Sequence, residues 1–562
     1  MSIFQMDHDN SIGQVQSVDT ASVVVHVTKA DQLSKLQVNH LVVIRASKRG
    51  QCLIGMVNKI VRQFDELSQE DDAEVSSRDI VRINLIGTLF DRVGRYENVF
   101  KRTLESVPEI DADCFVMADE ELTAFMSVIS RIDEHAKNPL LLGTYTLNEK
   151  AKAYIDGDKF FQRHAVITGS TGSGKSFTVA KIVEQIAKLP ACNALLFDIH
   201  GEYKPLSRTN IKHYKIAGPS DTAAEGILFL PYWLLTYEEM LSLLLDRSDM
   251  NAPNQAMLFR QYVIEYKQAS LAAAGRDISF TIDSPISYAI QGVLTKLSER
   301  NEERVEGARG DKAGDYNGKL SRFISRLQSK LEDRRLNFMF SNDEHLLNYE
   351  YMPTLCSQIM APGCSAGGVK IIDFSEVPSD VLPLIVSLVA RLVFSVQQWA
   401  RKQDRHPIAL LCDEAHLYIP EHTADASETS SLASFERIAK EGRKYGVGLV
   451  VITQRPSEVS RTVLSQSSNF VAMRLTNSDD QNVIKRLLPD SIGNYADLLP
   501  ILDIGEALVV GDASLLPSRI HIDEPEQKPD SATVKFWTEW SKDTSPDYIA
   551  DAVEAMRKQS RT

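Results

Sequence analysis

Apolar residues recur in short, β-branched runs over the first part of the chain. The runs cover residues 11–27, 40–46, 51–63 and 80–89, and polar or glycine-containing turns separate them. Runs of this length and spacing are typical of a small antiparallel barrel. We therefore predict an N-terminal β-barrel over residues 1–95. The acidic segment 64–79 is expected to be a solvated loop between two of its strands.

From about residue 150 the pattern changes to near-continuous apolar runs that alternate with helical segments. The predicted strands are 164–169, 193–198, 369–374, 408–413, 446–453, 469–475 and 506–512. Strands that are apolar throughout are buried on both faces, as in parallel sheets covered by helices. We therefore predict an α/β core with a mostly parallel sheet over residues 151–520. Residues 96–150 are taken as a connecting segment.

Two departures from this alternation are expected. Residues 230–345 are predicted to form a helical insertion, since 319–338 places Leu320, Phe323, Ile324 and Leu327 on one amphipathic face. The charged, glycine-rich segment 299–318 is predicted to be a mobile loop. Residues 521–562 are predicted to be a linker followed by a helical tail.

Composition restricts the class of protein. The chain has 562 residues, 43% of them hydrophobic, and a net charge of −14. Such an acidic chain does not wrap nucleic acid over its whole surface, so any DNA contact has to be local. The six cysteines are scattered without a C-x-x-C pair, which favours a reducing compartment. The most apolar segment, 381–394, contains Pro383 and Arg391, so we expect a buried core helix, no membrane span, and a cytoplasmic location.

The segment "GSTGSGKSFT" (169–178) contains the G-x-x-x-x-G-K-[ST] pattern, between a predicted strand and a predicted helix. Glycines let backbone N–H groups point at phosphates, and the helix N-terminus adds its dipole. ATP and Mg²⁺ are the expected cofactors, with Lys175 on the β- and γ-phosphates and Ser176 on the metal. The predicted nucleotide-binding residues are Gly169, Thr171, Gly172, Ser173, Gly174, Lys175, Ser176 and Phe177.

Acidic residues follow three of the predicted strands. "IALLCDEAH" (408–416) ends in Asp413, which is expected to orient the Mg²⁺ shell, and Glu414, which is expected to polarise the attacking water. The other two strands lead to Asp198, Glu202 and Asp373. These acids lie where open α/β sheets place ligands. Glu202 is a candidate for tuning the metal or the water, whereas Asp198 and His200 are equally explained as caps of a turn, and His416 is expected to be structural.

The segment "EGRKYGVGLVVITQRPSEV" (441–459) carries two further candidates. Its strand ends at Thr453 and Gln454, where a neutral side chain is placed to sense the γ-phosphate. Arg443 and Lys444 precede the same strand and lie at the opposite edge of the sheet. An arginine there suits a neighbouring subunit's nucleotide, as an arginine finger in trans does. A surface arginine on a basic helix explains the spacing equally well.

Taken together, these segments resemble the HerA branch of the HerA/FtsK ATPases, which are ring-forming DNA translocases. The matching segments are 163–176, 197–203, 230–239, 371–380, 412–420 and 441–459. The resemblance implies a RecA-like core, a homo-hexamer with nucleotide between subunits, and double-stranded DNA in the central channel. It further implies that Glu414 is the catalytic base, that Gln454 is the sensor, and that Arg443 and Arg163 act on nucleotide. A nuclease or other effector on the barrel face is the implied partner, in DNA end processing or anti-phage defence.

Two alternative functions remain open at this point. The acidic balance also fits a nucleotide-gated ring that assembles and regulates a partner with little translocation. A pump of the related membrane-coupled branches would need a membrane span, and the sequence offers only the interrupted segment 381–394.

Overall fold

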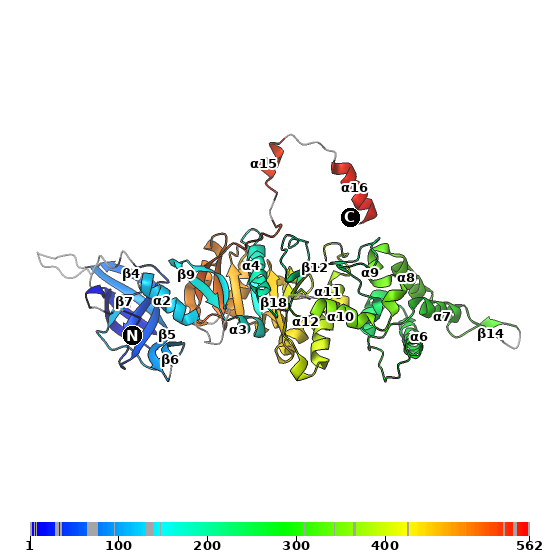
Figure 1. The fold of residues 1–562 in the computed structure, drawn as a ribbon, viewed down its shortest axis with the longest axis horizontal. Coiled ribbons are helices and arrows are strands. Elements are labelled where there is room, and N and C mark those ends of the chain that lie inside the picture. Colours follow the sequence, from blue (N-terminus) through cyan, green and yellow to red (C-terminus); the bar gives the residue numbers. More distant parts are fainter. Residues whose placement is uncertain are drawn as a thin grey trace, which may run out of the picture. The chain divides into compact units, whose positions relative to one another are not determined.

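The computed structural model describes residues 3–559 apart from short gaps. The gaps are residues 5, 7, 28–32, 34–35, 65–76, 95, 118, 131–138, 147, 307–309, 342, 364–366, 424–425, 489, 532–533 and 543–547. The described chain divides into two compact units (Figure 1). The first comprises Met1–Phe160, Ile167–Ile182 and Ser468–Glu524, and the second comprises Phe161–Val166, Val183–Ser467 and Pro525–Thr562.

The N-terminal part of the first unit is an antiparallel barrel. After a short 3₁₀ turn, η1 (His8–Asn10), its strands are β1 (Gly13–Asp19), β2 (Ser22–Val27), β3 (Leu41–Arg45), β4 (Gln51–Phe64), β5 (Ser77–Val93), β6 (Tyr96–Lys101) and β7 (Asp113–Val116). The strand order is β2-β1-β7-β3-β4-β5-β6, and an additional pairing of β2 with β5 closes the ring. The long strand β5 makes this possible because residues 80–84 pair with β2 and residues 88–93 pair with β6. The predicted barrel is confirmed, but its predicted end at residue 95 is too early, because β6 and β7 lie in the segment 96–150 and pair within the barrel sheet.

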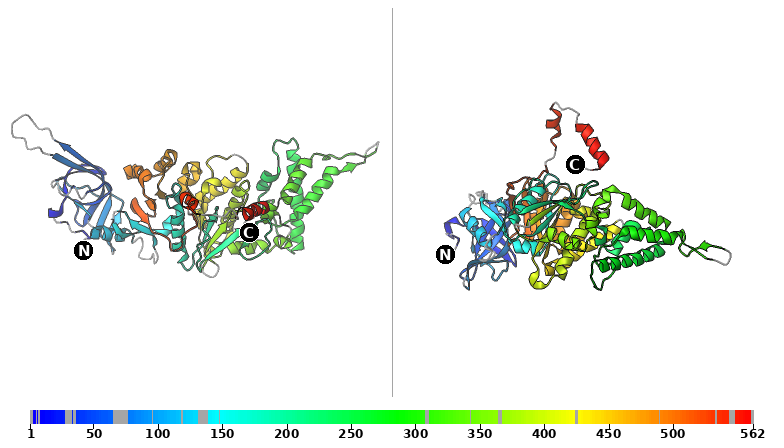
Figure 2. Two further views of the ribbon diagram at one scale, coloured as in Figure 1. Left: turned by 90° about the horizontal axis from the view of Figure 1, so that it is seen from above. Right: turned by 45° about the vertical axis from the view of Figure 1, so that its right-hand side comes forward.

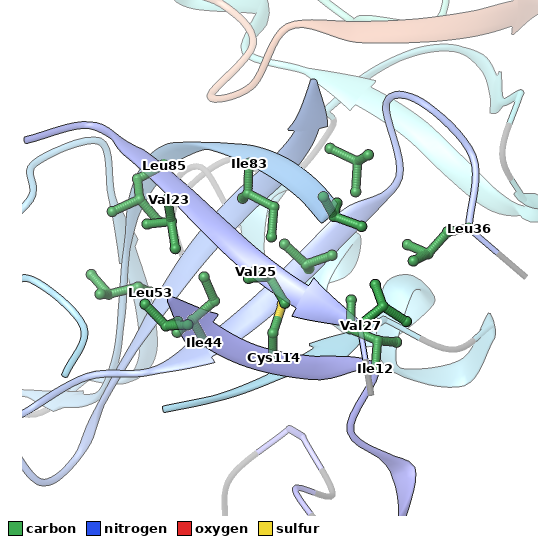
Figure 3. Packing of buried hydrophobic residues seen from close by; sticks show 14 of the residues in the cluster. Ile12, Val23, Val25, Val27, Leu36, Ile44, Leu53, Ile83, Leu85 and Cys114 are labelled. Atoms are coloured by element: carbon green, nitrogen blue, oxygen red, sulfur yellow. The ribbon is translucent and has the colours of Figure 1, made fainter. Parts of the chain in front are cut away.

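Alternating residues of these strands fill the barrel (Figure 3). Val23, Val25, Leu53 and Ile83 are fully buried in this cluster, as alternation along a strand requires when one face is inside. The acidic segment 64–79, predicted to be a solvated loop, falls largely outside the described residues. Its flanks, which the structure does describe, extend β4 and β5.

The remainder of the first unit contains strands that belong to the α/β core. They are β8 (Leu140–Tyr145), β9 (Asn148–Ile155), β19 (Asn469–Met473), β20 (Glu506–Gly511) and β21 (Ser518–Ile522). Their order is β19-β20-β21-β8-β9, and all four neighbouring pairs are antiparallel. The helices of this part are α2 (Asp119–Ser130) and α14 (Ser478–Leu487), which the 3₁₀ segment η9 (Asp490–Ile501) follows; α3 (Gly157–Gln162) and α4 (Lys175–Ala187) begin in this unit and end in the second.

The second unit contains the parallel part of the sheet. Its strands are β11 (Ala194–Asp198), β12 (Ile211–Ile216), β13 (Ile227–Leu228), β16 (Val369–Asp373), β17 (Ile408–Cys412) and β18 (Val447–Thr453). They run in the order β13-β12-β16-β11-β17-β18, with parallel pairing throughout. β10 (Ala165–Thr168) carries the chain from this unit into the first, and all of these strands belong to one 12-stranded sheet. The predicted α/β class with a mostly parallel sheet is confirmed.

Helices account for the rest of the second unit. They are α5 (Tyr237–Leu244), α6 (Ala252–Ala273), α7 (Ile290–Glu302), α8 (Ser321–Glu332), α9 (Asn337–Phe340), α10 (Tyr351–Met360), α11 (Leu382–Trp399), α12 (Ala426–Tyr445), α13 (Arg461–Gln466), α15 (Phe536–Trp540) and α16 (Tyr548–Lys558). Short 3₁₀ turns are η2 (Tyr232–Leu234), η3 (Arg334–Leu336), η4 (Glu344–Leu347), η6 (Lys402–Asp404), η7 (Ala415–Leu417) and η8 (Pro456–Glu458).

The predicted helical insertion comprises α5 to α10, between β13 and β16. α7 packs between α6 and α8, and the three helices lie side by side (Figure 2). Phe323, Ile324 and Leu327 on α8 are buried, as the amphipathic pattern predicts. The segment 299–318, expected to be a loop without regular structure, contains instead the end of α7 and a small antiparallel hairpin of β14 (Arg304–Val305) and β15 (Lys312–Ala313).

Helix α11 explains the apolar segment 381–394. It is the single described helix long and apolar enough to cross a membrane by length and composition, and 72% of that stretch is buried inside the protein. Pro383 lies in its first turn, where a missing N–H is tolerated, so the proline does not interrupt the helix. The prediction of a buried core helix is confirmed.

Candidate nucleotide-binding and catalytic site

The phosphate loop connects the buried strand β10 to helix α4. Gly172 and Gly174 adopt φ angles of +76° and +105°, which L-residues with side chains rarely adopt. These conformations turn successive backbone N–H groups toward one side and form an anion-binding nest. Lys175 and Ser176 are the first two residues of α4, where the helix dipole is positive. The loop therefore has the geometry of a phosphate cradle.

Neighbouring segments of the same unit support this loop closely. The Ser170 N–H donates to the carbonyl of Arg474 (2.8 Å), and the Gly505 N–H donates to the carbonyl of Ser173 (3.0 Å). Ser173 is fully buried. A Cβ at Gly169 would lie 2.3 Å from the Ser173 hydroxyl, so the glycine is required there by close packing. The loop is thus held in shape by its surroundings before any nucleotide binds.

Met473, at the end of β19, is a part of this support that the sequence did not predict. Its sulfur accepts a hydrogen bond from the Thr178 hydroxyl (3.5 Å), and its methyl carbon would lie 3.0 Å from a Cβ at Gly174. The residue comes some 300 positions after the loop, so no local pattern connects the two. Of the other predicted nucleotide-binding residues, Thr171 is exposed, whereas Lys175 and Phe177 are half-buried.

The second group of predicted residues follows β17 in the second unit. Asp413 and Glu414 are both buried, with 2% and 8% of their surface exposed. The Tyr418 hydroxyl donates to the Asp413 carbonyl (2.7 Å), and the Glu414 N–H donates to the Asp413 carboxylate (3.0 Å). Glu414 lies in the left-handed region at φ +45°. Non-glycine residues held in this region concentrate at functional sites, because the surrounding structure has to offset the strain.

Glu414 is linked to the end of the next strand through a histidine. Nδ1 of His416 lies 3.3 Å from the Glu414 carboxylate and 3.4 Å from the Thr453 hydroxyl. Thr453 also accepts the Arg455 N–H (3.0 Å), and Gln454 lies between these two residues in sequence. His416 was expected to be structural, and its contacts show that it touches the predicted catalytic carboxylate directly.

The acid that ends β11 has a structural role. The buried Asp198 carboxylate accepts backbone N–H groups of Gly201 (2.8 Å), Glu202 (3.0 Å) and Tyr203 (3.0 Å). Burial is the largest influence and raises the pKa of Asp198. The three hydrogen bonds oppose this rise, and the nearby Asp373 carboxylate adds to it. The structure therefore favours the capping interpretation of Asp198 over a catalytic one.

Asp373 is the partner of Asp198 in the parallel register of β11 and β16. It accepts the Ser375 N–H (2.8 Å) and pairs with Lys204 (3.1 Å). Burial opposes its ionisation, but these hydrogen bonds outweigh burial and hold the pKa of Asp373 below its usual value. The backbone of Glu202 contacts the C-terminal linker, since the Glu202 carbonyl accepts the Asp530 N–H (2.7 Å).

Arg443 lies at the opposite end of β18 from the carboxylates. It is in the last turn of α12, two residues before the helix ends at Tyr445, and its side chain is exposed. β17 and β18 are parallel, so Asp413 and Thr453 both lie at their carboxyl ends, whereas Arg443 precedes the amino end of β18. A seven-residue strand spans about 20 Å. Arg443 and Glu414 of the same chain are therefore separated by the length of the strand.

The parallel sheet and the strand–glycine loop–helix unit define a P-loop NTPase, an enzyme that hydrolyses ATP. Residues 140–393 match the family described as DUF87: Helicase HerA, central domain. These residues make up just under half of the chain, and their match confirms the resemblance to the HerA helicases that the sequence indicates.

Individual relatives agree with this family. The chain is 27% identical over 393 residues to the DNA double-strand break repair helicase HerA of Sulfolobus acidocaldarius, covering 68% of each protein. It is also 27% identical over 394 residues to the protein of the same name from Saccharolobus solfataricus, covering 69% of this chain and 70% of the relative. Among solved structures it is similar to VirB4 of Thermoanaerobacter pseudethanolicus, with 16% identity, a TM-score of 0.44, and coverage of 72% and 98%.

Proposed function

We propose that this HerA-type ATPase is an ATP-driven, ring-forming translocase on double-stranded DNA. The observation that carries the proposal is the separation of Arg443 from Glu414 by the length of β18. An arginine that stabilises the transferring phosphate has to reach the nucleotide, and Arg443 is displaced from its own chain's carboxylates. Closure of a homo-hexamer would bring the arginine of one subunit to the nucleotide of the next.

The residues of each subunit have separate tasks in this proposal. The phosphate loop binds ATP, with Lys175 on the terminal phosphates and the Ser176 hydroxyl and Asp413 holding Mg²⁺, which neutralises phosphate charge when bound. The positive φ angles of Gly172 and Gly174 fit the loop to phosphate oxygens. Glu414 orients and deprotonates the attacking water, and Gln454 senses the γ-phosphate. The buried Glu414 carboxylate lies 3.3 Å from Nδ1 of His416.

Arg443 and Arg163 are proposed to act on the nucleotide of the neighbouring subunit. Both side chains are exposed. Arg443 lies before the start of β18, and Arg163 lies before the start of β10. An arginine supplied in trans is worth about 10³–10⁵ in turnover in related phosphoryl-transfer enzymes. Assembly would therefore control activity, because an isolated subunit lacks this contribution.

The relatives' names support DNA as the substrate, since they are called DNA double-strand break repair helicases. We propose a central channel for double-stranded DNA and a nuclease or other effector docked on the barrel. DNA end processing is favoured over anti-phage defence, because the relatives' names state repair. The location proposed is cytoplasmic. We propose a barrel that includes β6 and β7, a core that begins with β8 and contains the insertion (230–345), and a tail over 521–562.

The test is ATP turnover of size-defined complexes with and without duplex DNA. Turnover is expected to rise with duplex DNA in wild-type hexamers and to be abolished by Lys175→Ala and by Glu414→Gln. Arg443→Ala is expected to lose turnover while keeping nucleotide affinity, since the arginine belongs to the other subunit's site. Normal turnover in a monomeric Arg443→Ala protein would refute the assignment in trans.

A second candidate is a nucleotide-gated ring that assembles and regulates a partner with little translocation. The net charge of −14 favours it, because a DNA-threading channel has to be basic. The same assay separates the two functions. Turnover that is unchanged by duplex DNA, with a partner that stays active on Glu414→Gln rings, would support the scaffold and contradict the motor.

A further inference from the structure

His164 is a buried histidine placed immediately between Arg163 and strand β10. Only 3% of its surface is exposed, although both preceding residues, Gln162 and Arg163, are exposed. Its φ angle is +55°, a left-handed conformation that is uncommon for a residue with a side chain. The chain accepts this strain at a position where asparagine or glycine would be easier, so the imidazole has a specific task there.

Both ring nitrogens of His164 contact backbone groups of other elements. Nδ1 accepts the N–H of Leu449 in β18 (2.9 Å), and Nε2 lies 3.1 Å from the carbonyl of Ala439 in α12. An acceptor at Nδ1 and a donor at Nε2 together require the neutral ring with its proton on Nε2. The pKa of His164 is lowered to about 4, mainly by burial; the hydrogen bond to the Ala439 carbonyl opposes this shift, and the positive charge of Arg443 adds to it. The neutral form is therefore the one present near neutral pH.

The carbonyl of Ala439 is significant because of its place in α12. In an α-helix the carbonyl of residue 439 accepts the N–H of residue 443. His164 thus hydrogen-bonds the same carbonyl that receives the backbone N–H of Arg443.

Two glycines allow the three segments to pack without intervening side chains. A Cβ at Gly442 would lie 2.6 Å from the Val447 carbonyl and 3.6 Å from Cε1 of His164. A Cβ at Gly448 would lie 2.7 Å from the Phe161 carbonyl. Both distances to carbonyl oxygens are shorter than real Cβ contacts. The end of α12, the start of β18 and the segment 161–164 are therefore in direct backbone contact.

We propose that His164 is a positioning residue that fixes Arg163 and Arg443 to one rigid edge, so that both arginines meet the neighbouring subunit's nucleotide together. Arg163 is its direct neighbour in the chain, and Arg443 is held through the Ala439 carbonyl. The inference rests on the proposed action of these arginines in trans. It adds that the two arginines work as one preorganised pair with a buried histidine as their support.

The test is complementation between two inactive variants. His164→Gln and His164→Asn keep an intact phosphate loop, and Lys175→Ala keeps an intact arginine edge. Asparagine tolerates the left-handed conformation but is too short to reach both backbone groups, so it provides a second variant if glutamine disturbs folding. A mixed ring places the loop of a His164 variant beside the arginines of a Lys175→Ala subunit.

Each His164 variant alone is expected to lower kcat about 100-fold with little change in KM, since displacing a catalytic group by about 1 Å has an effect of this size. Binding of a fluorescent ATP analogue and hexamer assembly are expected to be unchanged. Equimolar mixing with Lys175→Ala subunits is expected to restore turnover to roughly a quarter of wild type by random assembly. His213→Gln is the matched control, because Nε2 of His213 also contacts a backbone carbonyl, that of Leu206 (2.6 Å), and lies on β12, which three strands separate from β18.

A mixture of Arg443→Ala and Lys175→Ala subunits tests the action in trans separately from the positioning role of His164. If this mixture regains turnover and the His164 mixtures do not, the positioning role is overturned and the proposed function stands. If neither mixture regains turnover, the action in trans is overturned and the inference falls with it. Wild-type turnover of both His164 variants alone would also overturn the positioning role.

Discussion

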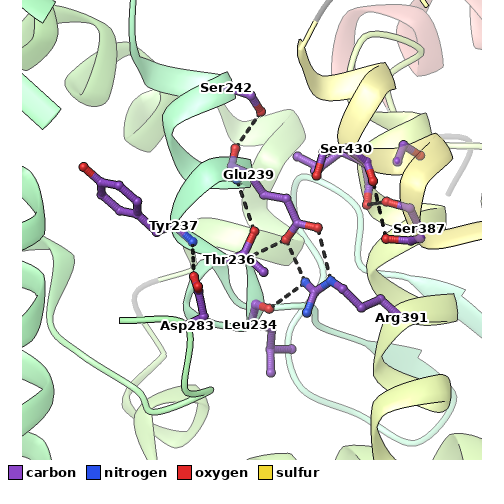
Figure 4. A network of polar contacts seen from close by, with 12 residues as sticks. Leu234, Thr236, Tyr237, Glu239, Ser242, Asp283, Ser387, Arg391 and Ser430 are labelled. Carbon is purple, nitrogen blue, oxygen red and sulfur yellow. Dashed lines mark hydrogen bonds and ion pairs between the residues drawn. The ribbon is translucent and has the colours of Figure 1, made fainter. Parts of the chain in front are cut away.

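A buried ion pair joins the helical insertion to helix α11 of the core (Figure 4). Nε and one terminal nitrogen of Arg391 donate to the two carboxylate oxygens of Glu239, at 3.1 and 2.7 Å. The side chain of Glu239 is 1% exposed, whereas that of Arg391 is 25% exposed. The Thr236 N–H also donates to Glu239 (2.7 Å), and Arg391 donates to the Leu234 carbonyl (3.0 Å). Loss of the arginine would leave the carboxylate buried with one remaining donor.

The magnitude follows from these contacts. Arg391→Met removes two charge-assisted hydrogen bonds from a buried carboxylate, and breaking a buried pair on one side costs about 3–5 kcal/mol. Glu239→Gln is expected to cost less, because Arg391 is partly hydrated and keeps the Leu234 carbonyl. The double variant Arg391→Met/Glu239→Gln leaves no unpaired buried charge. Its loss in free energy of unfolding is therefore expected to be roughly 2 kcal/mol smaller than the sum of the two single losses.

Trp233 provides the assay. It is 2% exposed and lies beside Leu234, whereas Trp399, Trp537 and Trp540 are all more than 70% exposed. Replacing these three by phenylalanine leaves Trp233 as the single tryptophan, since the chain has four. Its fluorescence shift in urea then reports the unfolding of the base of the insertion, and the midpoint and slope give the free energy of unfolding.

The matched control is Arg276→Met, because Arg276 also lies in the insertion and pairs with Glu350 (3.4 Å). Both partners of that pair are more than half exposed, so the control is expected to cost at most about 0.5 kcal/mol. Equal losses for Arg391→Met and Arg276→Met would refute the reasoning that burial makes the first pair strong.

Two further predictions concern the nucleotide site and its edge. Gly174→Ala is expected to weaken ATP-analogue binding at least tenfold, about 1.4 kcal/mol, because the φ angle of Gly174 is +105° and the new Cβ would lie 3.0 Å from the Met473 methyl carbon. Gly157→Ala is the control, since a Cβ at Gly157 has room. Equal affinities of the two variants for the analogue would contradict the packing argument. The pKa of His164 is about 4 in the folded state and 6.5 in the unfolded state, so the unfolded state binds more protons between these pH values. The free energy of unfolding therefore falls by roughly 3 kcal/mol as the pH falls from 6.5 to 4. The stability gap between wild type and His164→Asn is therefore expected to narrow from pH 7 to pH 4 in denaturant titrations, and a constant gap would contradict the assignment.

The barrel and the phosphate loop were predictable because their signals are local. A β-branched run predicts a strand wherever its partner lies, and a glycine pattern followed by Lys175 predicts a nest and a helix start within ten residues. Asp413 and Glu414 were predictable for the same reason, since an apolar strand immediately precedes them. The buried helix over 381–394 was predictable from its apolar composition and length, but Pro383, expected to interrupt the segment, lies in the first turn of α11.

Other elements were not predictable from local patterns. The sequence pattern places most of β8 and β9 in a connecting segment, because the short runs 140–145 and 148–155 do not indicate which sheet they join. Their pairing with β21, some 370 residues later, decides that membership. The antiparallel direction of β19 to β21 is likewise set by partners rather than by composition.

The amino-acid sequence by itself determined which residues can bind phosphate and which carboxylates follow buried strands, because spacing and hydrophobic period specify those features within one segment. The folded structure shows that the Asp198 carboxylate caps a turn, one of the roles that the sequence leaves open, and that His416 touches Glu414; both contacts span five residues or fewer. His164 connects Arg163 to the end of α12 through a contact between groups 275 residues apart. That contact forms only when packing brings distant backbone groups together, and no local sequence pattern encodes it.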